Sequence, residues 1–210
     1  EPVTVSTFHG VKSLIQLYDS IRTSEANNLT REKLGDNYDS VHEKIFLFSL
    51  CWSIGGSLDD VSRRKFNNCL SDIDSIFPPA NTLYDYYVDI QKNEFVAWDG
   101  KVPSFHPSPT AEFFDLIVPT VDTTRNSYIL NTLMKYKYNV LVTGATGTGK
   151  TILARNLLGN LPDTHAQLTV NFSAATTSSA VQDIIEGPME KRSKDKLGPQ
   201  GGKNLVIFID

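Results

Sequence analysis

The sequence predicts an α/β protein, in which a parallel β-sheet carries helices on both faces and is preceded by a small all-helical unit. Three observations predict this class. Apolar residues recur at spacings of three and four through much of residues 1–79, as in amphipathic helices. From residue 139 onward, short apolar runs alternate with helical patterns, and this β-α-β order calls for a parallel sheet. A glycine-rich run at residues 144–151 follows an apolar run and precedes a helical pattern.

The helical unit is expected to begin with a helix over Phe8–Ile21, which Ser6 or Thr7 can cap. The apolar residues predicted to form its inner face are Phe8, Val11, Leu14, Ile15, Tyr18 and Ile21. Val41–Ile54 is so densely apolar that a helix there is expected to be buried on most of its surface. The glycines at residues 55–56 are expected to end it.

A third helix is predicted through Val61, Phe66, Leu70, Ile73 and Ile76. The preceding Ser57-Leu58-Asp59-Asp60 resembles a capping box with Asp in place of Glu, and Pro78-Pro79 is expected to stop the helix. Residues 1–79 are therefore predicted to form the helical domain.

Residues 80–112 are predicted to be a strand-containing connector. Aromatic and β-branched residues in Leu83–Trp98 favour two strands around a turn near Lys92-Asn93. Prolines up to Pro109 then indicate an irregular chain. Aromatic side chains can also form a platform for stacked bases, but no basic residues are interleaved with these, so packing is the favoured interpretation.

Residues 113–210 are predicted to form the sheet domain. It begins with a short strand over Phe113–Val118 and a helix over Asn126–Lys137. The alternating elements that follow are a strand at 139–143, a helix at 151–158, a strand at 167–172, a helix at 178–191 and a strand at 205–209. Because a natural domain rarely ends on a buried strand, the last of these suggests a piece of a longer protein.

Charge and composition restrict the partners. The formal net charge of -4 argues against nucleic acid, since phosphate backbones are bound by clustered Lys and Arg. The densest basic run, Lys191–Lys196, is interpreted as a solvated loop. Cys51 and Cys69 lack metal-ligand spacing and are expected to be buried free thiols, which suggests a reducing, cytosolic compartment. No apolar run is long enough to span a bilayer, so no membrane partner is expected.

The glycine-rich run carries the clearest chemistry. The pattern G-x-x-x-x-G-K-[ST] is matched without a mismatch by Gly144-Ala145-Thr146-Gly147-Thr148-Gly149-Lys150-Thr151. Its glycines let successive N–H groups converge on a phosphate, and the helix starting at Lys150 directs its positive dipole end at the same anion. Lys150 is expected to contact the β- and γ-phosphates, and the Thr151 hydroxyl to bind Mg²⁺. We predict a nucleoside-triphosphate site from Gly144 to Ile152; the alternative is a glycine-rich turn without a ligand.

The apolar run Leu205–Ile209 followed by Asp210 has the form of a Walker B strand, whose terminal Asp holds Mg²⁺ through its water shell. Many buried strands end in Asp, so this signal is weak alone. One helix-strand-helix unit separates it from Lys150, as expected for two strands that flank a P-loop. We therefore predict Asp210 as a second metal-binding residue.

Several segments together resemble the third AAA+ module of a dynein heavy chain. They are Phe114–Thr123 with its Val-Pro-Thr-x-Asp-Thr motif, the P-loop, Val170–Thr177 with Asn-Phe-Ser-x-x-Thr-Thr, and the strand to Asp210. Many families share the P-loop, whereas the two other motifs are far more specific. Phe48–Gly56 and the aromatic segment before Pro103 fit the same chain in the same order, so the resemblance covers nearly all 210 residues. It is closer to axonemal than to cytoplasmic forms.

The resemblance implies an ATP-driven, minus-end-directed microtubule motor with a ring of six AAA+ modules, associated with the cytoskeleton of the cytoplasm or of a ciliary or flagellar axoneme. The implied partners are the other modules of the same heavy chain, the microtubule through a distant stalk, and dynein intermediate and light chains. In this family the third module is chiefly regulatory, since its nucleotide state gates how hydrolysis in the first module is communicated to the stalk.

The resemblance also implies a division of the chain and a set of ligands. Residues 1–79 would be the lid subdomain of the second module, and a P-loop AAA+ large subdomain of the third module would follow. ATP or ADP with Mg²⁺ would be bound, and Val118, Pro119 and Thr120 would lie beside the adenine.

The family's catalytic acid would follow Asp210, so no catalytic residue is predicted within the chain. The later sensor residue, the module's own lid and the neighbour's arginine finger would also lie outside it. We expect the 210-residue chain to bind nucleotide weakly and to hydrolyse it negligibly.

Two alternatives stay open. One is a site that holds ADP or ATP permanently as a structural or regulatory element. The other is a different P-loop enzyme such as a small-molecule kinase, which the helical unit and the missing acceptor-binding insert disfavour.

Overall fold

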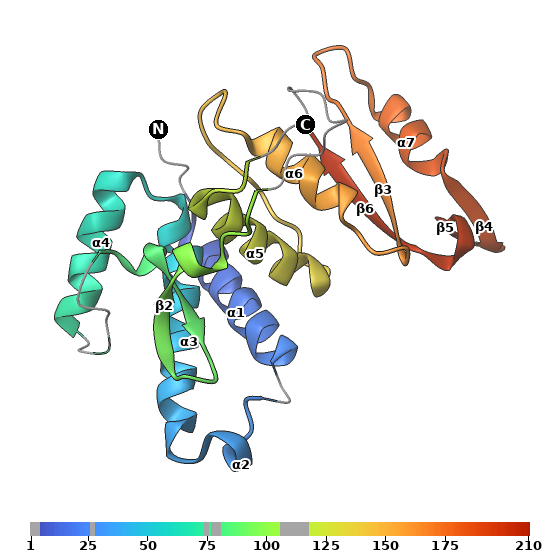
Figure 1. Ribbon diagram of the computed structural model, residues 1–210. Coiled ribbons are helices and arrows are strands. Elements are labelled where there is room, and N and C mark those ends of the chain that lie inside the picture. The colour runs from blue at the N-terminus through green and yellow to red at the C-terminus, as the bar shows by residue number, and fades with distance from the viewer. Residues whose placement is uncertain (1–4, 26–27, 74–75, 77–80, 106–117) are drawn as a thin grey trace. The chain divides into compact units, whose positions relative to one another are not determined.

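The computed structural model describes residues 5–25, 28–73, 76, 81–105 and 118–210 (Figure 1). Contacts divide the chain into two compact units, Glu1–Thr143 and Gly144–Asp210. The described part of the first unit is mainly helical, with one β-hairpin, and the second unit is α/β. This mixture of a helical part and a part with a parallel sheet confirms the predicted fold class.

The first unit begins with α1 (Thr7–Ser24), α2 (Arg31–Leu34), α3 (Tyr38–Ser53) and α4 (Asp60–Ile73). Of the two candidate caps of α1, Ser6 caps it, because its Oγ accepts a hydrogen bond from the His9 backbone N–H at 3.4 Å. The predicted capping box of α4 is wrong: Asp59 Oδ1, not Ser57, accepts from the Ser62 backbone N–H at 2.8 Å. Pro78-Pro79 lies outside the described residues. The short 3₁₀ turns are η1 (Gly35–Asn37), η2 (Gly55–Ser57), η3 (Leu83–Asp85), η4 (Trp98–Lys101) and, in the second unit, η6 (Gln200–Gly202).

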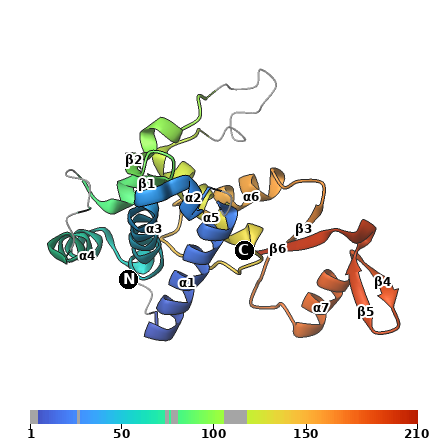
Figure 2. The same cartoon turned by 90° about the horizontal axis from the view of Figure 1, so that it is seen from below.

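Helix α3 is the centre of the first unit and packs along α1 (Figure 2). Val41, Ile45 and Phe48 are each at most 1% exposed, which confirms the predicted heavily buried helix. Cys51, on the same helix, is fully buried, and burial raises the pKa of its thiol to about 12. Cys69 on α4 is exposed, so its predicted burial is wrong. Both cysteines are free thiols.

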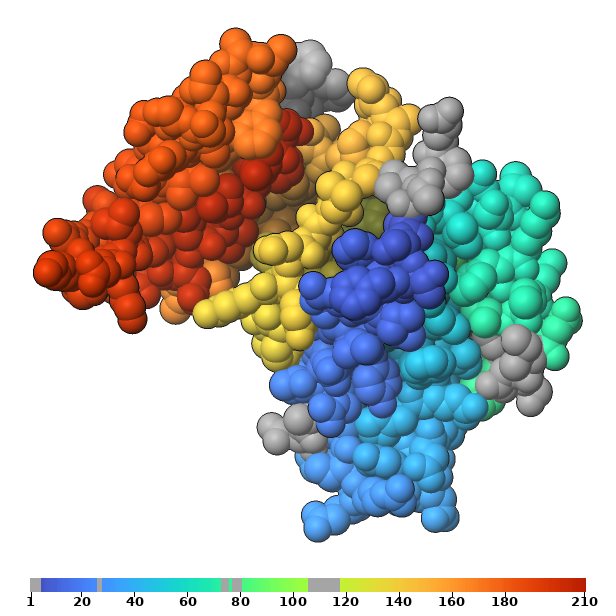
Figure 3. Space-filling view, turned by 180° about the vertical axis from the view of Figure 1, so that it is seen from behind, coloured from blue at the N-terminus to red at the C-terminus, as the bar shows by residue number. Residues whose placement is uncertain are grey.

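The predicted inner face of α1 is only partly correct. Its buried apolar residues are Leu17 and Ile21, whereas Phe8, Val11 and Ile15 are 72%, 42% and 54% exposed. Figure 3 shows α1 forming part of the molecular surface. Helical spacing fixes which residues share a face, but tertiary contacts decide how far along that face a neighbouring element covers it.

A β-hairpin follows, formed by β1 (Tyr86–Asp89) and β2 (Glu94–Ala97) paired antiparallel. Its turn lies where predicted, with Asn93 in the left-handed region at φ +54°. The turn is tied to α3 because Lys44 Nζ donates to Asn93 Oδ1 at 2.8 Å.

The aromatic residues around this hairpin are packed rather than displayed. Trp98 is 1% exposed, and its ring lies 5.2 Å from Tyr87, 5.4 Å from Tyr128 and 6.4 Å from Phe48 between centroids. This arrangement confirms the packing interpretation over a base-stacking platform.

Helix α5 (Val121–Lys135) begins earlier than the predicted Asn126. Thr120 and Thr123 cap its start reciprocally: Thr120 Oγ1 accepts from the Thr123 N–H at 3.1 Å, and Thr123 Oγ1 accepts from the Thr120 N–H at 2.8 Å. Helical periodicity does not reveal this cap, because three of the first four residues of α5, Asp122–Thr124, are polar.

Two strands were predicted in this region. The first, Phe113–Val118, is not tested, because residues 113–117 lie outside the described residues. The second, Asn139–Thr143, forms no strand, and its Val140, Leu141 and Val142 are 41%, 82% and 41% exposed. A strand needs ladder hydrogen bonds to a neighbour, and no segment of the described chain pairs with these residues.

The second unit contains α6 (Lys150–Gly159), β3 (His165–Val170), α7 (Ser178–Glu186), β4 (Met189–Ser193), β5 (Lys196–Pro199) and β6 (Asn204–Ile209). Strands β3 and β6 pair in parallel, from His165 opposite Asn204 to Val170 opposite Ile209. Helices α6 and α7 lie on opposite sides of this pair (Figures 1 and 2). The predicted burial of β6 is only partial, since Ile207 and Ile209 are 39% and 53% exposed.

The predicted helix over residues 178–191 is too long. Helix α7 ends at Glu186, and Gly187-Pro188 leads into an antiparallel hairpin of β4 and β5. Pro188 lacks the N–H that would continue the helix and restricts the residue before it. The basic run Lys191–Lys196 is exposed as predicted, but it forms most of this hairpin rather than an irregular loop.

Candidate nucleotide-binding site

The glycine-rich loop lies in the second unit and turns directly into α6. Gly147 and Gly149 have φ values of +81° and +82°, a backbone conformation that residues with a side chain rarely adopt. Gly149 is the N-terminal cap of α6, so the helix begins at Lys150 with no capping side chain over its free N–H groups. Thr148 Oγ1 donates to the Ala145 carbonyl at 2.8 Å and closes the loop on itself. An anion can therefore approach the backbone N–H groups without meeting a Cβ at these glycines.

Lys150 folds back over the loop. Its Nζ donates to the carbonyl oxygens of Gly144 at 3.0 Å and Ala145 at 2.7 Å. A lysine ammonium has three donors, so two hold the side chain in place and the third is left for a phosphate oxygen. These contacts keep a positive charge beside the helix N-terminus, where the dipole also favours an anion.

Thr151 and Asp210 meet at the carboxyl end of β6. Thr151 Oγ1 donates to Asp210 Oδ1 at 2.9 Å, although 59 residues separate them in sequence. The backbone of Asp210 is held by the end of β3 and the segment that follows it. The Asp210 N–H donates to the Val170 carbonyl at 3.0 Å, and the Phe172 N–H donates to the Asp210 carbonyl at 3.1 Å. The sequence did not reveal this clamp by Val170 and Phe172, because strand neighbours cannot be read from one strand.

These residues fit a phosphate with its magnesium ion. Mg²⁺ prefers oxygen ligands and keeps several waters, so one hydroxyl and one carboxylate suffice beside phosphate oxygens. The Thr151 hydroxyl donates its hydrogen bond to Asp210, which leaves its lone pairs free for a cation. Within the described residues no cluster of three or more His, Cys, Asp or Glu side chains could hold a metal by itself.

Four other residues were predicted to contact the nucleotide, and for these the structure gives position and exposure. Ile152 lies in the first turn of α6 and is 54% exposed. Val118 is 54% exposed, Pro119 is half-buried and Thr120 caps α5. Because these last three belong to the first unit, their position beside an adenine stays a prediction.

The glycine-rich loop, the helix that starts at its lysine and the aspartate at the end of a parallel strand define a P-loop protein with an α/β core. Comparison with known families agrees: a family model described as the P-loop containing dynein motor region matches residues 105–210. A second, the dynein heavy chain AAA lid domain, matches residues 1–100. The chain belongs to the dynein heavy chain family, and it joins a lid domain to a P-loop AAA+ motor region.

Known relatives support the same family. The chain is 38% identical over 212 residues to dynein axonemal heavy chain 2 of Homo sapiens, with all of this chain and 5% of that protein covered. It is 42% identical over 170 residues to the dynein-1-beta heavy chain of the flagellar inner arm I1 complex of Chlamydomonas reinhardtii, with 80% of this chain and 4% of that protein covered. The chain thus spans about one twentieth of the length of these relatives. No helix among the residues that the structure describes is long and apolar enough to cross a membrane.

Proposed function

We propose that the second unit binds the magnesium complex of ATP or ADP as the regulatory nucleotide site of a dynein-type microtubule motor. The observation that carries this proposal is the convergence of Lys150, Thr151 and Asp210. The lysine is held over the loop, and the hydroxyl and carboxylate meet 2.9 Å apart at the end of β6. The loop residues Gly144–Thr151 and Ile152 are the proposed nucleotide contacts, with Val118, Pro119 and Thr120 beside the base.

The proposal assigns a role to each part of the chain. Residues 1–79 form the lid of the second AAA+ module, residues 80–112 the connector, and residues 113–210 the start of the third module's large subdomain. The match of the lid and motor-region families to successive halves of the chain supports this order.

In the full heavy chain, the partners would be the other AAA+ modules, the microtubule through the stalk, and intermediate and light chains. The names of the relatives, which are axonemal and flagellar, support a place in a cilium or flagellum.

Titration of the 210-residue chain with a fluorescent ADP analogue in the presence of Mg²⁺ tests the site. Lys150→Ala should weaken binding by about 10- to 100-fold, because a hydrogen bond to a charged group is worth about 1.5–3 kcal/mol. The control is Lys203→Ala, an exposed lysine at the opposite end of β6. Equal affinity of both variants and the unchanged chain would contradict the proposal.

A second candidate function is nucleotide holding without hydrolysis. Among the described residues, Asp210 is the carboxylate bonded to the P-loop, and its proposed role is metal binding rather than activation of water. Phosphate release from ATP by this chain should therefore be negligible. Turnover that disappears in Lys150→Ala would show that hydrolysis occurs.

A further inference from the structure

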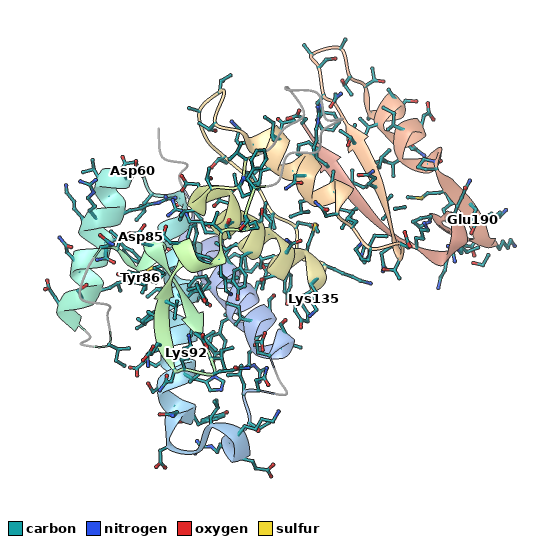
Figure 4. The ribbon with its side chains drawn as sticks, in the orientation of Figure 1. Asp60, Asp85, Tyr86, Lys92, Lys135 and Glu190 are labelled. Atoms are coloured by element: carbon teal, nitrogen blue, oxygen red, sulfur yellow. The ribbon has the colours of Figure 1, made fainter. Side chains whose placement is uncertain are left out.

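The β4–β5 hairpin lies away from the nucleotide-binding site. Strand β5 continues through Gln200–Gly202 into the amino end of β6, whereas Asp210 stands at the carboxyl end. The six residues of β6 span about 20 Å at 3.3 Å per residue. Figure 4 shows Glu190 of β4 on this projecting hairpin. A molecule bound to the hairpin would therefore leave the P-loop open.

The two faces of the hairpin differ. On one face, Arg192 lies over Gly198, donates to the Pro199 carbonyl and contacts Glu190 at 3.5 Å. Its charge is thus satisfied within the hairpin. On the other face, Lys191 stands directly opposite Leu197, whose side chain is 53% exposed.

The hairpin region is positively charged, although the chain as a whole is negatively charged. Residues 189–203 contain five basic and two acidic side chains, whereas the whole chain has a formal net charge of -4. Lys191, Lys194, Lys196 and Lys203 form no ion pair with any residue that the structure describes. Four positive charges and an exposed leucine are therefore available to a partner.

The backbone limits what that partner can be. Within the described chain, β4 and β5 pair only with each other, so each keeps an outer edge of N–H and C=O groups. Lysines on edge strands discourage pairing with neutral or basic strands. An acidic strand is the exception, because the same lysines attract it. An extended peptide can also pair with the edge through main-chain hydrogen bonds, which nucleic acids and lipids cannot supply.

A shallow pocket of about 470 Å³ adjoins the base of the hairpin. Its lining residues are Ala166, Pro188, Gln200, Gly201 and Lys203. It joins the hairpin because Pro188 precedes β4 and Gln200 follows β5. This open depression extends the surface of the hairpin towards Lys203.

We propose that the hairpin is a docking surface for an acidic, extended polypeptide segment that alternates carboxylates with apolar side chains. The segment pairs with the outer edge of β5, so its alternating side chains fall on the two faces of the hairpin. Its carboxylates lie on the face of Lys196, its apolar side chains cover Leu197 on the other face, and the charges of Lys191 and Lys194 add to the attraction. This inference does not depend on nucleotide binding.

Fluorescence anisotropy with a labelled peptide of alternating Glu and Val tests the surface on the full 210-residue chain. Changing Lys191, Lys194 and Lys196 together to Glu should weaken binding at least 10-fold, and raising the salt concentration should weaken binding to the unchanged chain. The matched control changes Lys12, Lys33 and Lys65, exposed lysines of the first unit, to Glu and should bind as the unchanged chain does. Leu197→Ser should lower the affinity with the lysines intact. Thermal unfolding of each variant shows whether it is folded.

Three outcomes would overturn the proposal. One is equal loss of binding in both triple variants, which would indicate attraction to net charge alone. The second is equal binding of a peptide with Lys in place of Glu. The third is hairpin-dependent binding of phosphatidylserine vesicles or a single-stranded oligonucleotide that is as tight as that of the acidic peptide.

Discussion

The carboxylate of Asp210 combines two tasks at one position. It accepts a hydrogen bond from Thr151, and in the proposed site its negative charge binds the cation. An amide at this position could keep the first task but not the second, because its oxygen still accepts a hydrogen bond while its charge is lost.

Asp210→Asn should therefore remove the benefit of Mg²⁺ while sparing nucleotide binding without metal. We expect the Mg²⁺ enhancement of ADP affinity to fall by about 10- to 100-fold, the typical effect of losing a group that supports a metal site. Titrations with and without Mg²⁺ measure it. Asp163→Asn, in an exposed loop of the same unit, is the control. An unchanged Mg²⁺ dependence would show that Asp210 does not serve the metal.

A second residue, His42, links α3 to α1 and gives a prediction about pH. Its Nδ1 lies 2.7 Å from the Tyr18 hydroxyl, and its Nε2 is buried with no hydrogen-bond partner in the described structure. Burial, with a smaller contribution from Arg22, lowers the pKa of His42 below 6.5. The unfolded chain therefore takes up a proton at a higher pH than the folded chain.

It follows that the free energy of unfolding should fall as the pH drops through 6.5 towards the lower pKa of the folded state. Above this window the contribution of His42 is constant. His42→Gln should flatten that slope in urea titrations at pH 5 to 8, whereas His9→Gln, at an exposed position, should not. A slope that persists in His42→Gln would assign it to other groups.

At the level of elements, the P-loop depends on a backbone conformation as much as on its side chains. Gly149 has φ +82° and caps α6, whereas Gly159 ends the same helix with no atom within 4 Å of an added Cβ and no positive φ. The same substitution at the two glycines therefore separates the effect of the left-handed conformation from that of adding a side chain to α6.

Gly149→Ala should destabilise the loop by about 1–2 kcal/mol, the cost of a left-handed conformation for an L-residue, and weaken ADP binding accordingly. Gly159→Ala should leave ADP affinity unchanged and be neutral or stabilising. Titration and thermal unfolding of both variants check this. Equal nucleotide affinity in the two variants would mean that the loop tolerates a side chain at residue 149.

The elements also show where sequence patterns suffice. Dense apolar spacing placed the end of α3 within one residue, although the helix begins at Tyr38, three residues before the predicted start. The start of α5 and the end of α7 were missed, because both depend on chemistry outside the apolar pattern. A polar Thr120–Thr123 cap opens the first, and Gly187-Pro188 ends the second.

At the level of the whole molecule, the two units differ in their cores. Nearly all buried apolar residues described belong to the first unit, and the second contributes only Leu158 and Val170 among those described. We expect the second unit to unfold first on heating, since less apolar burial stabilises it.

Nucleotide should change this order, because a ligand stabilises the state it binds. At 100 times the dissociation constant, MgADP should stabilise the second unit by about 2.7 kcal/mol. Both tryptophans, Trp52 and Trp98, lie in the first unit and report its unfolding. Circular dichroism should therefore show a shifted transition that tryptophan fluorescence does not. A coincident shift of both signals would mean that the units unfold together.

The sequence by itself determined the family of this protein and the position of its P-loop. The P-loop can be recognised from the sequence because all of its residues are close together in the chain. They are glycines that permit positive φ, followed by a lysine and a threonine at fixed spacing. The amphipathic helices follow from local spacing in the same way.

The tertiary structure decided what depends on distant residues. It brought Thr151 to Asp210, covered only half of the α1 face and left residues 139–143 without a strand partner. It also turned a basic run into a hairpin in which Arg192 is satisfied internally and the neighbouring lysines form no ion pair among the described residues. These outcomes depend on hydrogen bonds and packing between residues far apart in the chain, which no single segment specifies.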